Sequence, residues 1–246
     1  MSLPDNINFD RVIADILSDM ETVAHGWAAG RPKDEIALLN RITEQLSRKR
    51  RKCDIGVETP MEMEAAIYEL HRQGDNQKDR YGSDFAVTID IPTAGFKKTA
   101  LFQLKKSTNY KASLTRVQLD DGCVLKNIEE RNFVLSVDED RLGYRIRSVR
   151  ECLDAIGAGN ASKQFNTSEW EFLVAWLLKW FRCEVGKPTK PEDKDPVEPL
   201  LESYLIPEPL PLITEREKIS EHNIPEGFVV ARSWLYYTFK PKEPKQ

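Results

Sequence analysis

Apolar side chains recur at the helical period in two segments near the start of the chain. Residues 9–24 place one apolar face at Phe9, Val12, Ile13, Ile16, Leu17 and Met20. Residues 34–47 place another at Leu38, Leu39, Ile42 and Leu46. This spacing predicts two amphipathic helices, with a break at Gly26–Pro32 between them.

Two shorter elements are expected next. Cys53, Ile55 and Val57 alternate with polar residues, which favours a short strand over 52–58. Pro60 suits the first turn of a third helix, which the pattern predicts over 61–73.

The clearest pattern is a pair of half-buried strands around residues 84–91 and 99–106. In the first strand, alternate residues are apolar and share one face: Phe85, Val87, Ile89 and Ile91. The second does the same with Ala100, Phe102 and Leu104. A short loop with Gly95 joins the strands, so they predict a hairpin. If the apolar faces coincide, Asp84, Gln103 and Lys105 project together from the opposite face.

The rest of the chain alternates between regular and irregular segments. Residues 113–130 are predicted to be helical in part, interrupted at Asp121-Gly122, and residues 132–137 and 144–149 form a strand pair. Ser168 and Glu171 indicate a capping box that opens a Trp-rich helix, which forms core or a subunit interface. Gly186–Pro211 is typical of a Pro-rich linker, and a last strand or strand pair lies within 227–239.

These elements predict an α/β protein with a mixed sheet, divided at about residue 160. We expect residues 1–160 to form the principal domain with its N-terminal helices. Residues 161–246 would then carry the Trp-rich helix, the linker and a β tail for oligomerisation or partner docking. The chain of 246 residues is long enough to bury a substantial core.

Composition narrows the class of protein. No apolar run reaches the length of about 18 residues that a membrane span requires, and the first residues do not resemble a signal peptide. The 4 cysteines form no CxxC pair, so neither a zinc site nor a disulfide framework is expected. The three histidines are scattered, which disfavours a His-based metal site or a catalytic triad. We therefore expect a cytoplasmic protein without a membrane partner.

The net charge of −4 hides local basic segments. Residues 48–52 read RKRRK, and Lys97-Lys98 and Lys105-Lys106 follow later in the chain. A phosphate backbone responds to local charge rather than to the average, although such a run is also common at a solvated helix end.

Asp84, Gln103 and Lys105 together suit phosphodiester hydrolysis. Such chemistry needs a divalent metal held by hard oxygen ligands and a cation near the attacking water. Asp84 can bind the metal, the Leu104 carbonyl can supply a further oxygen, and Lys105 can supply the cation. Isolated residues of these types are also ordinary on strands, so the hairpin context carries the inference.

The motif around Asp84 and Lys105 resembles the D…(E/Q)xK signature of the PD-(D/E)xK nuclease superfamily, in its QxK variant. It reads Gly82-Ser83-Asp84 and, 19 residues after Asp84, Gln103-Leu104-Lys105. The resemblance covers roughly residues 33–150. It implies a restriction-endonuclease-like αβββαβ core, Mg²⁺ dependence (with Mn²⁺ possible) and cutting of DNA by metal-activated water. Ser83 replaces the Pro of the signature, and Gln103 removes one negative charge from the site.

The resemblance also implies a carboxylate on a preceding helix. Glu64 lies 20 residues before Asp84 and borders an apolar face, with Glu62 on that face's other side. Glu35 sits on the apolar stripe of its own predicted helix, an odd place for a carboxylate without a partner. We favour Glu64 as the metal ligand and keep Glu35 as the second candidate.

Function and partners follow by analogy. The chain resembles the Mrr-like and phage-defence branch, and thus the endonuclease subunit of an antiviral defence complex, for example of the Lamassu or Hachiman type. Partners would be DNA, a second copy, and an ATPase of the SMC-like or helicase kind. The alternatives are a catalytically inactive nuclease-like scaffold and an RNA-directed enzyme, since no base-reading motif is visible.

Overall fold

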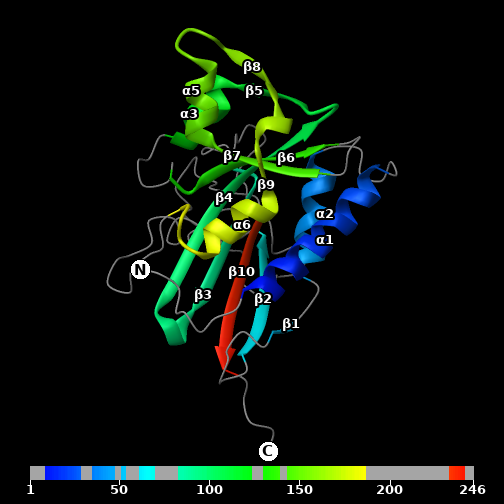
Figure 1. The fold of residues 1–246 in the computed structure, drawn as a ribbon, viewed down its shortest axis with the longest axis vertical. Helices are drawn as coiled ribbons and strands as arrows, with labels where there is room; N and C mark the ends of the chain where they lie inside the picture. The colour runs from blue at the N-terminus through cyan, green and yellow to red at the C-terminus, as the bar shows by residue number, and fades with distance from the viewer. Residues whose placement is uncertain are drawn as a thin grey trace, which may run out of the picture.

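The protein is described by a computed structural model. It describes residues 9–28, 35–47, 51–53, 61–69, 83–123, 130–138, 143–186 and 233–241. Figure 1 shows the arrangement of these segments.

The described helices are α1 (Asp10–Ala28), α2 (Glu35–Ser47), α3 (Arg116–Cys123), α5 (Val149–Ile156) and α6 (Leu173–Phe181), with short 3₁₀ turns at Pro92–Ala94 and Thr167–Glu169. The described strands are β1 (Arg51–Cys53), β2 (Met61–Glu69), β3 (Phe85–Ile91), β4 (Phe96–Ser107), β5 (Lys111–Thr115), β6 (Asn132–Asp138), β7 (Gly143–Ser148), β8 (Ser162–Asn166), β9 (Glu171–Phe172) and β10 (Ser233–Pro241). The predicted α/β class with a mixed sheet is confirmed.

One eight-stranded sheet runs through the described residues in the order β1-β2-β10-β3-β4-β6-β7-β9. β3 and β4 are antiparallel, whereas β4 and β6 are parallel and are connected through α3. β10 lies between β2 and β3, antiparallel to the first and parallel to the second. The last described strand of the chain is therefore a central strand of the sheet.

The predicted hairpin is confirmed. β3 and β4 pair in register from Phe85 with Phe102 to Ile91 with Phe96. At the turn, Gly95 has a φ of 58°, a left-handed conformation that glycine adopts without steric cost. The two apolar sets coincide, so the sheet has one face that carries Phe85 and Phe102, called face A here, and an opposite face, called face B.

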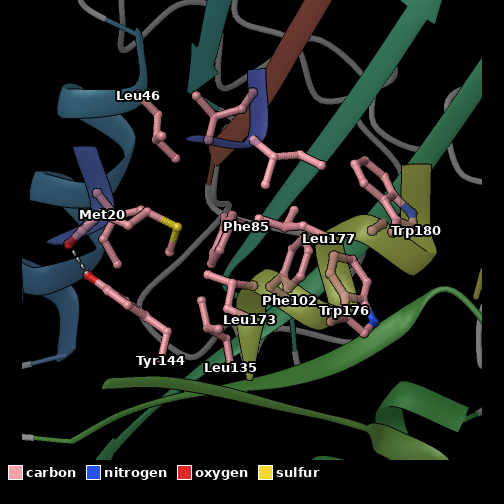
Figure 2. Packing of buried hydrophobic residues seen from close by; sticks show 14 of the residues in the cluster. Met20, Leu46, Phe85, Phe102, Leu135, Tyr144, Leu173, Trp176, Leu177 and Trp180 are labelled. Atoms are coloured by element: carbon pink, nitrogen blue, oxygen red, sulfur yellow. Dashed lines mark hydrogen bonds between the residues drawn. The ribbon is translucent and has the colours of Figure 1, made fainter. Parts of the chain in front are cut away.

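Face A is covered by α1, α2 and α6, which complete the main core. In Figure 2, Met20 of α1 and Leu46 of α2 lie on one side of Phe85 and Phe102, and Trp176 and Trp180 of α6 lie on the other. The predicted burial of the Trp-rich helix is confirmed, because Trp176 and Trp180 are both buried. The Tyr144 hydroxyl donates a hydrogen bond of 2.7 Å to the Met20 carbonyl and ties β7 to α1.

A second, smaller core lies where β6 meets α3, α5 and the two-stranded sheet of β5 and β8. These elements gather at one end of the molecule in Figure 1. The buried residues of this second core include Leu114, Leu119, Val134, Cys152 and Phe165. This unit covers part of face B beside β6.

The predicted helix over 61–73 is wrong within the described residues, because Met61–Glu69 forms β2. The segment MEMEAAIYE favours a helix by composition, yet it also alternates with period two. Pairing with β1 on one side and β10 on the other decides in favour of the strand. The β10 partner follows β2 by more than 160 positions, so local pattern cannot reveal it.

Two further expectations need correction. The helix α3 runs through Asp121 and Gly122 without interruption. Ser168 does not cap a helix, because its amide and its hydroxyl both donate to the Asn166 side chain and α6 begins only at Leu173. Of the region expected to begin at residue 161, α6 packs in the main core and β10 joins the eight-stranded sheet.

The other expectations stand as follows. α1, α2, β6, β7 and β10 confirm the predicted elements, and β1 covers only the start of the strand expected over 52–58. The predicted linker from residue 187 onward and residues 48–50 of the basic run lie outside the described residues. Among the described helices, none is long and apolar enough to cross a membrane.

Candidate metal and catalytic site

The candidate site lies along one edge of β4, beyond the end of β3. The pairing of β3 with β4 ends at Phe85 and Phe102, while β4 continues to Ser107. Backbone N–H and C=O groups of one strand residue point to the same side, and the side alternates from residue to residue. The amide of Leu101 donates to Arg131 on the β6 side, whereas the Phe102 carbonyl accepts from Asp84 on the β3 side. From Phe102 to Lys106, the even-numbered residues of β4 therefore direct their backbone groups toward the β3 side, where β4 has no described strand partner beyond the end of β3.

Asp84 takes the first place along this edge. Its amide donates a 2.7 Å hydrogen bond to the Phe102 carbonyl, which extends the strand pairing by one step. Its carboxylate oxygen Oδ2 accepts a 2.7 Å hydrogen bond from the amide of Leu104. Because a backbone donor holds the carboxylate, its position beside β4 is set by the strand and not by a flexible side chain.

Glu35 takes the second place along the same edge. It is the first residue of α2, where the helix dipole favours a negative charge. Its oxygen Oε1 accepts a 2.9 Å hydrogen bond from the amide of Lys106, and its Oε2 lies 3.6 Å from the Lys105 ammonium. Lys105 is only 13% exposed and Glu35 is 42% exposed. The structure thus brings together a helix carboxylate and the lysine of the sequence motif.

The Leu104 carbonyl points to the edge between these two carboxylates. The amides of Leu104 and Lys106, which hold Asp84 and Glu35, lie two residues apart, or about 7 Å along a strand. The carbonyl of Leu104 leaves the strand between them, by the same alternation of backbone groups. Three oxygen donors from three separate elements therefore converge on a stretch of about two residues of β4.

Gln103 contributes from face B. Its side chain is 4% exposed, and its oxygen Oε1 has no hydrogen-bond partner among the described residues. A buried amide oxygen without a donor costs free energy, roughly 1–3 kcal/mol, unless a cation or a water satisfies it. This oxygen belongs to the residue before Leu104 and is a fourth candidate ligand.

The donor set fits a hard divalent cation such as Mg²⁺, which prefers carboxylate, carbonyl and water oxygens. The described residues contain no group of three or more His, Cys, Asp and Glu side chains that could hold a metal ion. The candidate set has two carboxylates, from Asp84 and Glu35, and takes its other oxygens from Leu104 and Gln103. Water would have to complete the coordination, as is usual for Mg²⁺.

Glu64 lies too far from Asp84 to share this site. It is on β2 and pairs with Thr238 of β10, which in turn pairs with Asp90 of β3. Asp90 is six residues along β3 from Asp84, which corresponds to about 20 Å, and β10 intervenes between β2 and β3. This fold therefore does not bring Glu64 to Asp84, whereas it brings Glu35 to the same edge of β4. Glu62, two residues further along β2, lies farther away still, and the side chains of both lie outside the described part of the chain.

Two supporting residues are not evident from the sequence. The Ser83 hydroxyl, which stands where the signature has Pro, is buried and donates a 3.2 Å hydrogen bond to the Asn132 side chain of β6. Asp138 ends β6, is buried, and accepts hydrogen bonds from the Ser107 hydroxyl and the Tyr110 amide. Both contacts join distant segments, so only the fold reveals them.

Comparison of this chain with protein-family models, with curated proteins and with solved structures finds no match. The function is therefore argued from the geometry of the site.

Proposed function

We propose that this protein is a metal-dependent DNA endonuclease of the PD-(D/E)xK type. One observation carries the proposal: Glu35, Asp84 and Lys105, which are far apart in sequence, meet along one edge of β4. Two carboxylates can hold a divalent metal, and a lysine can stabilise the negative charge that develops in metal-assisted phosphodiester hydrolysis.

The order of elements also supports a restriction-endonuclease-like core. Among the described elements, a helical segment, β2, β3, β4, α3 and β6 occur in this order along the chain, and β4 and β6 are parallel. With β1 and β5 set aside, this order corresponds to αβββαβ. The departures are β1 before β2, β5 before α3, and β10, which is inserted between β2 and β3.

In this proposal Asp84, Glu35 and the Leu104 carbonyl hold the cation, and Gln103 orients the site from face B. When bound, Mg²⁺ would polarise the phosphate and lower the pKa of an attacking water. Lys105 would donate a hydrogen bond to that water and stabilise the negative charge that develops on the phosphate. Glu35 holds the Lys105 ammonium in place through their 3.6 Å contact. Attack in line would leave a 5′-phosphate.

The test is cleavage of supercoiled plasmid DNA by the purified protein with Mg²⁺, alone and with its neighbouring gene products. We expect nicked and linear DNA, full inhibition by EDTA, and a loss of at least about a hundredfold in rate for Asp84→Asn and Lys105→Ala. Lys111→Ala is the matched control, since Lys111 is an exposed lysine on β5 and its variant should cut like the wild type.

Equal cutting by wild type and Lys105→Ala would point to a contaminant or to another site. Folded wild-type protein that never cuts DNA, with any neighbouring product and either Mg²⁺ or Mn²⁺, would favour the inactive scaffold. RNA cut in preference to DNA would make the protein an RNA-directed enzyme.

We propose further that the nuclease is the effector of an antiviral defence complex, controlled by an ATPase of the SMC-like or helicase kind or by self-association. An unrestrained small nuclease would damage its host, so a controlling partner is required. The check is phage plaque formation on cells that carry the gene with its neighbours. Protection that disappears with Lys105→Ala is expected, and unchanged protection would contradict this role.

A further inference from the structure

A row of side chains crosses the sheet from Lys105 to its far edge. Lys105 of β4 is paired with Ser136 of β6, Ser136 with Arg145 of β7, and Arg145 with Phe172 of β9. Residues directly opposite each other in a sheet share a face, so the four side chains lie along face B. Three strand spacings separate Lys105 from Phe172, or about 14 Å.

The far end of this row is an exposed stack of an aromatic ring and a guanidinium group. The Arg145 guanidinium carbon lies 3.3 Å from the centre of the Phe172 ring and 5.9 Å from the centre of the Tyr110 ring. Phe172 is 56% exposed, which is unusual for a large apolar side chain on a folded surface. The stack therefore leaves one aromatic surface open to solvent, backed by a positive charge.

Arg145 is only partly used by the protein itself. One guanidinium nitrogen makes a long 3.4 Å hydrogen bond to the Trp170 carbonyl, and the buried Nε has no hydrogen-bond partner among the described residues. No carboxylate pairs with Arg145 among the described ion pairs. The neighbouring Ser136 hydroxyl, next in the row toward Lys105, is also buried without a described partner. Arg145 therefore forms few described hydrogen bonds within the protein, whereas Ser136 is buried and not accessible to a ligand.

We propose that Phe172 and Arg145 bind an unpaired nucleobase and the adjoining phosphate of a DNA strand whose scissile phosphate lies at Lys105. Every base has a flat face that stacks on an aromatic ring, and a guanidinium group binds phosphate through several donors. Lys105 and Phe172 lie about 14 Å apart across the sheet, so one strand can reach both, while the buried Ser136 between them makes no contact with it. The inference rests on the proposed function for the identity of the strand, and its binding test does not require cleavage.

The first test is fluorescence anisotropy in EDTA, with a labelled single-stranded DNA oligonucleotide and a blunt duplex of the same sequence. Phe172→Ala should weaken single-strand binding about tenfold, and Phe172→Trp should restore it. Val174→Ala is the matched control, because Val174 is 41% exposed, lies two residues away and is not part of the row. We expect it to bind like the wild type.

The second test separates stacking from phosphate contact by the salt dependence of binding. Phe172→Ala should leave the slope of log affinity against log salt unchanged, since stacking releases no counterions. Arg145→Gln should make that slope shallower by about one, as expected for one lost phosphate contact. Circular dichroism and urea unfolding of each variant confirm that the fold is retained.

The outcomes distinguish this inference from the proposed function. Wild-type affinity of Phe172→Ala for single-stranded DNA, in a protein that cuts DNA, would overturn the inference alone. Phe172-dependent binding in a protein that never cuts would support it while the proposed function fails. A loss confined to the duplex, or tighter Phe172-dependent binding of RNA of the same sequence, would overturn an unpaired DNA strand as the occupant.

Discussion

Two lysines on the same strand, Lys98 and Lys105 of β4, occupy opposite kinds of environment. Lys105 points to face B, lies in the part of β4 that extends beyond the end of β3, and contacts the Glu35 carboxylate. Lys98 points to face A, is 1% exposed, and donates 2.6 Å hydrogen bonds to the carbonyls of Trp180 and Val185. The strand alternation alone sends one lysine into the core and the other to the candidate site, because seven positions separate them.

The difference shows which charge is available for chemistry. Burial lowers the pKa of Lys98 to about 8, with a smaller opposing effect of nearby Cys183. One acceptor, the Trp180 carbonyl, is in the last turn of α6, where a cation is favourable, and the other, Val185, follows the helix by four residues. Lys98 is therefore a structural residue, whereas Lys105 contacts the Glu35 carboxylate and keeps part of its surface open.

The largest expected effect is on the rate of DNA cleavage, and it distinguishes Glu35 from Glu64 as the second carboxylate of the candidate site. Glu35→Gln should reduce DNA cleavage at least about a hundredfold, because it removes one of two anionic ligands and the partner of Lys105. Glu64→Gln should stay within about twofold of the wild type, since Glu64 lies about 20 Å from Asp84 along the sheet. Initial rates on plasmid DNA under saturating Mg²⁺ check both. The opposite ranking would restore Glu64 to the site and refute the placement of Glu35.

The next effect concerns stability at Lys98. Lys98→Ala should lower the free energy of unfolding by about 3 kcal/mol, because the carbonyls of Trp180 and Val185 each lose a hydrogen bond and the Trp180 ring loses packing. Urea denaturation followed by tryptophan fluorescence measures the change. Lys111→Ala, on the exposed side of β5, serves as the control and should remain within about 0.5 kcal/mol of the wild type.

A third effect follows from the lowered pKa of Lys98. Between pH 8 and pH 10.5 the unfolded lysine still holds a proton that the folded lysine has released, so this residue makes stability rise with pH. Its contribution is at most about 3 kcal/mol over that window. Burial raises the pKa of Cys152 to about 12, and of Tyr144 and Tyr236 as well, which opposes the rise.

The difference between wild type and Lys98→Met therefore isolates the lysine. Urea unfolding of both proteins at about pH 7.5 and about pH 10 should show the advantage of Lys98→Met shrinking, or its deficit growing, as the pH increases. A difference that does not change with pH would mean that the folded Lys98 has an ordinary pKa.

The smallest effect is at Gly186, which packs against Lys98. Its φ is +64°, and a Cβ there would lie 3.3 Å from Cε of Lys98. Gly186→Ala should destabilise the protein by about 1 kcal/mol through the left-handed backbone conformation. Gly26→Ala offers the comparison, since a Cβ at Gly26 would meet nothing within 4 Å and its helix tolerates alanine. A larger loss at Gly26 than at Gly186 would contradict this account.

The sequence predicts the hairpin and its three polar residues because alternation is a local signal. Phe85 and Phe102 share a face wherever the two strands pair, which places Gln103 and Lys105 on face B, while Asp84 lies just before β3 at the edge of β4. The choice between Glu35 and Glu64 depends instead on β10, whose insertion converts the expected helix at Glu64 into a strand. The burial of Lys98 depends on α6, which is also distant in sequence, since 82 positions separate Lys98 from Trp180.

The central claim is that Lys105, and not merely a lysine of β4, serves the chemistry beside Asp84 and Glu35. The most direct measurement compares plasmid cleavage by Lys105→Met and Lys98→Met, at a temperature where urea unfolding shows both to be folded. We predict that Lys105→Met loses at least about a hundredfold in rate and keeps wild-type stability, whereas Lys98→Met changes stability and keeps its rate. Undiminished cleavage by folded Lys105→Met would contradict the account.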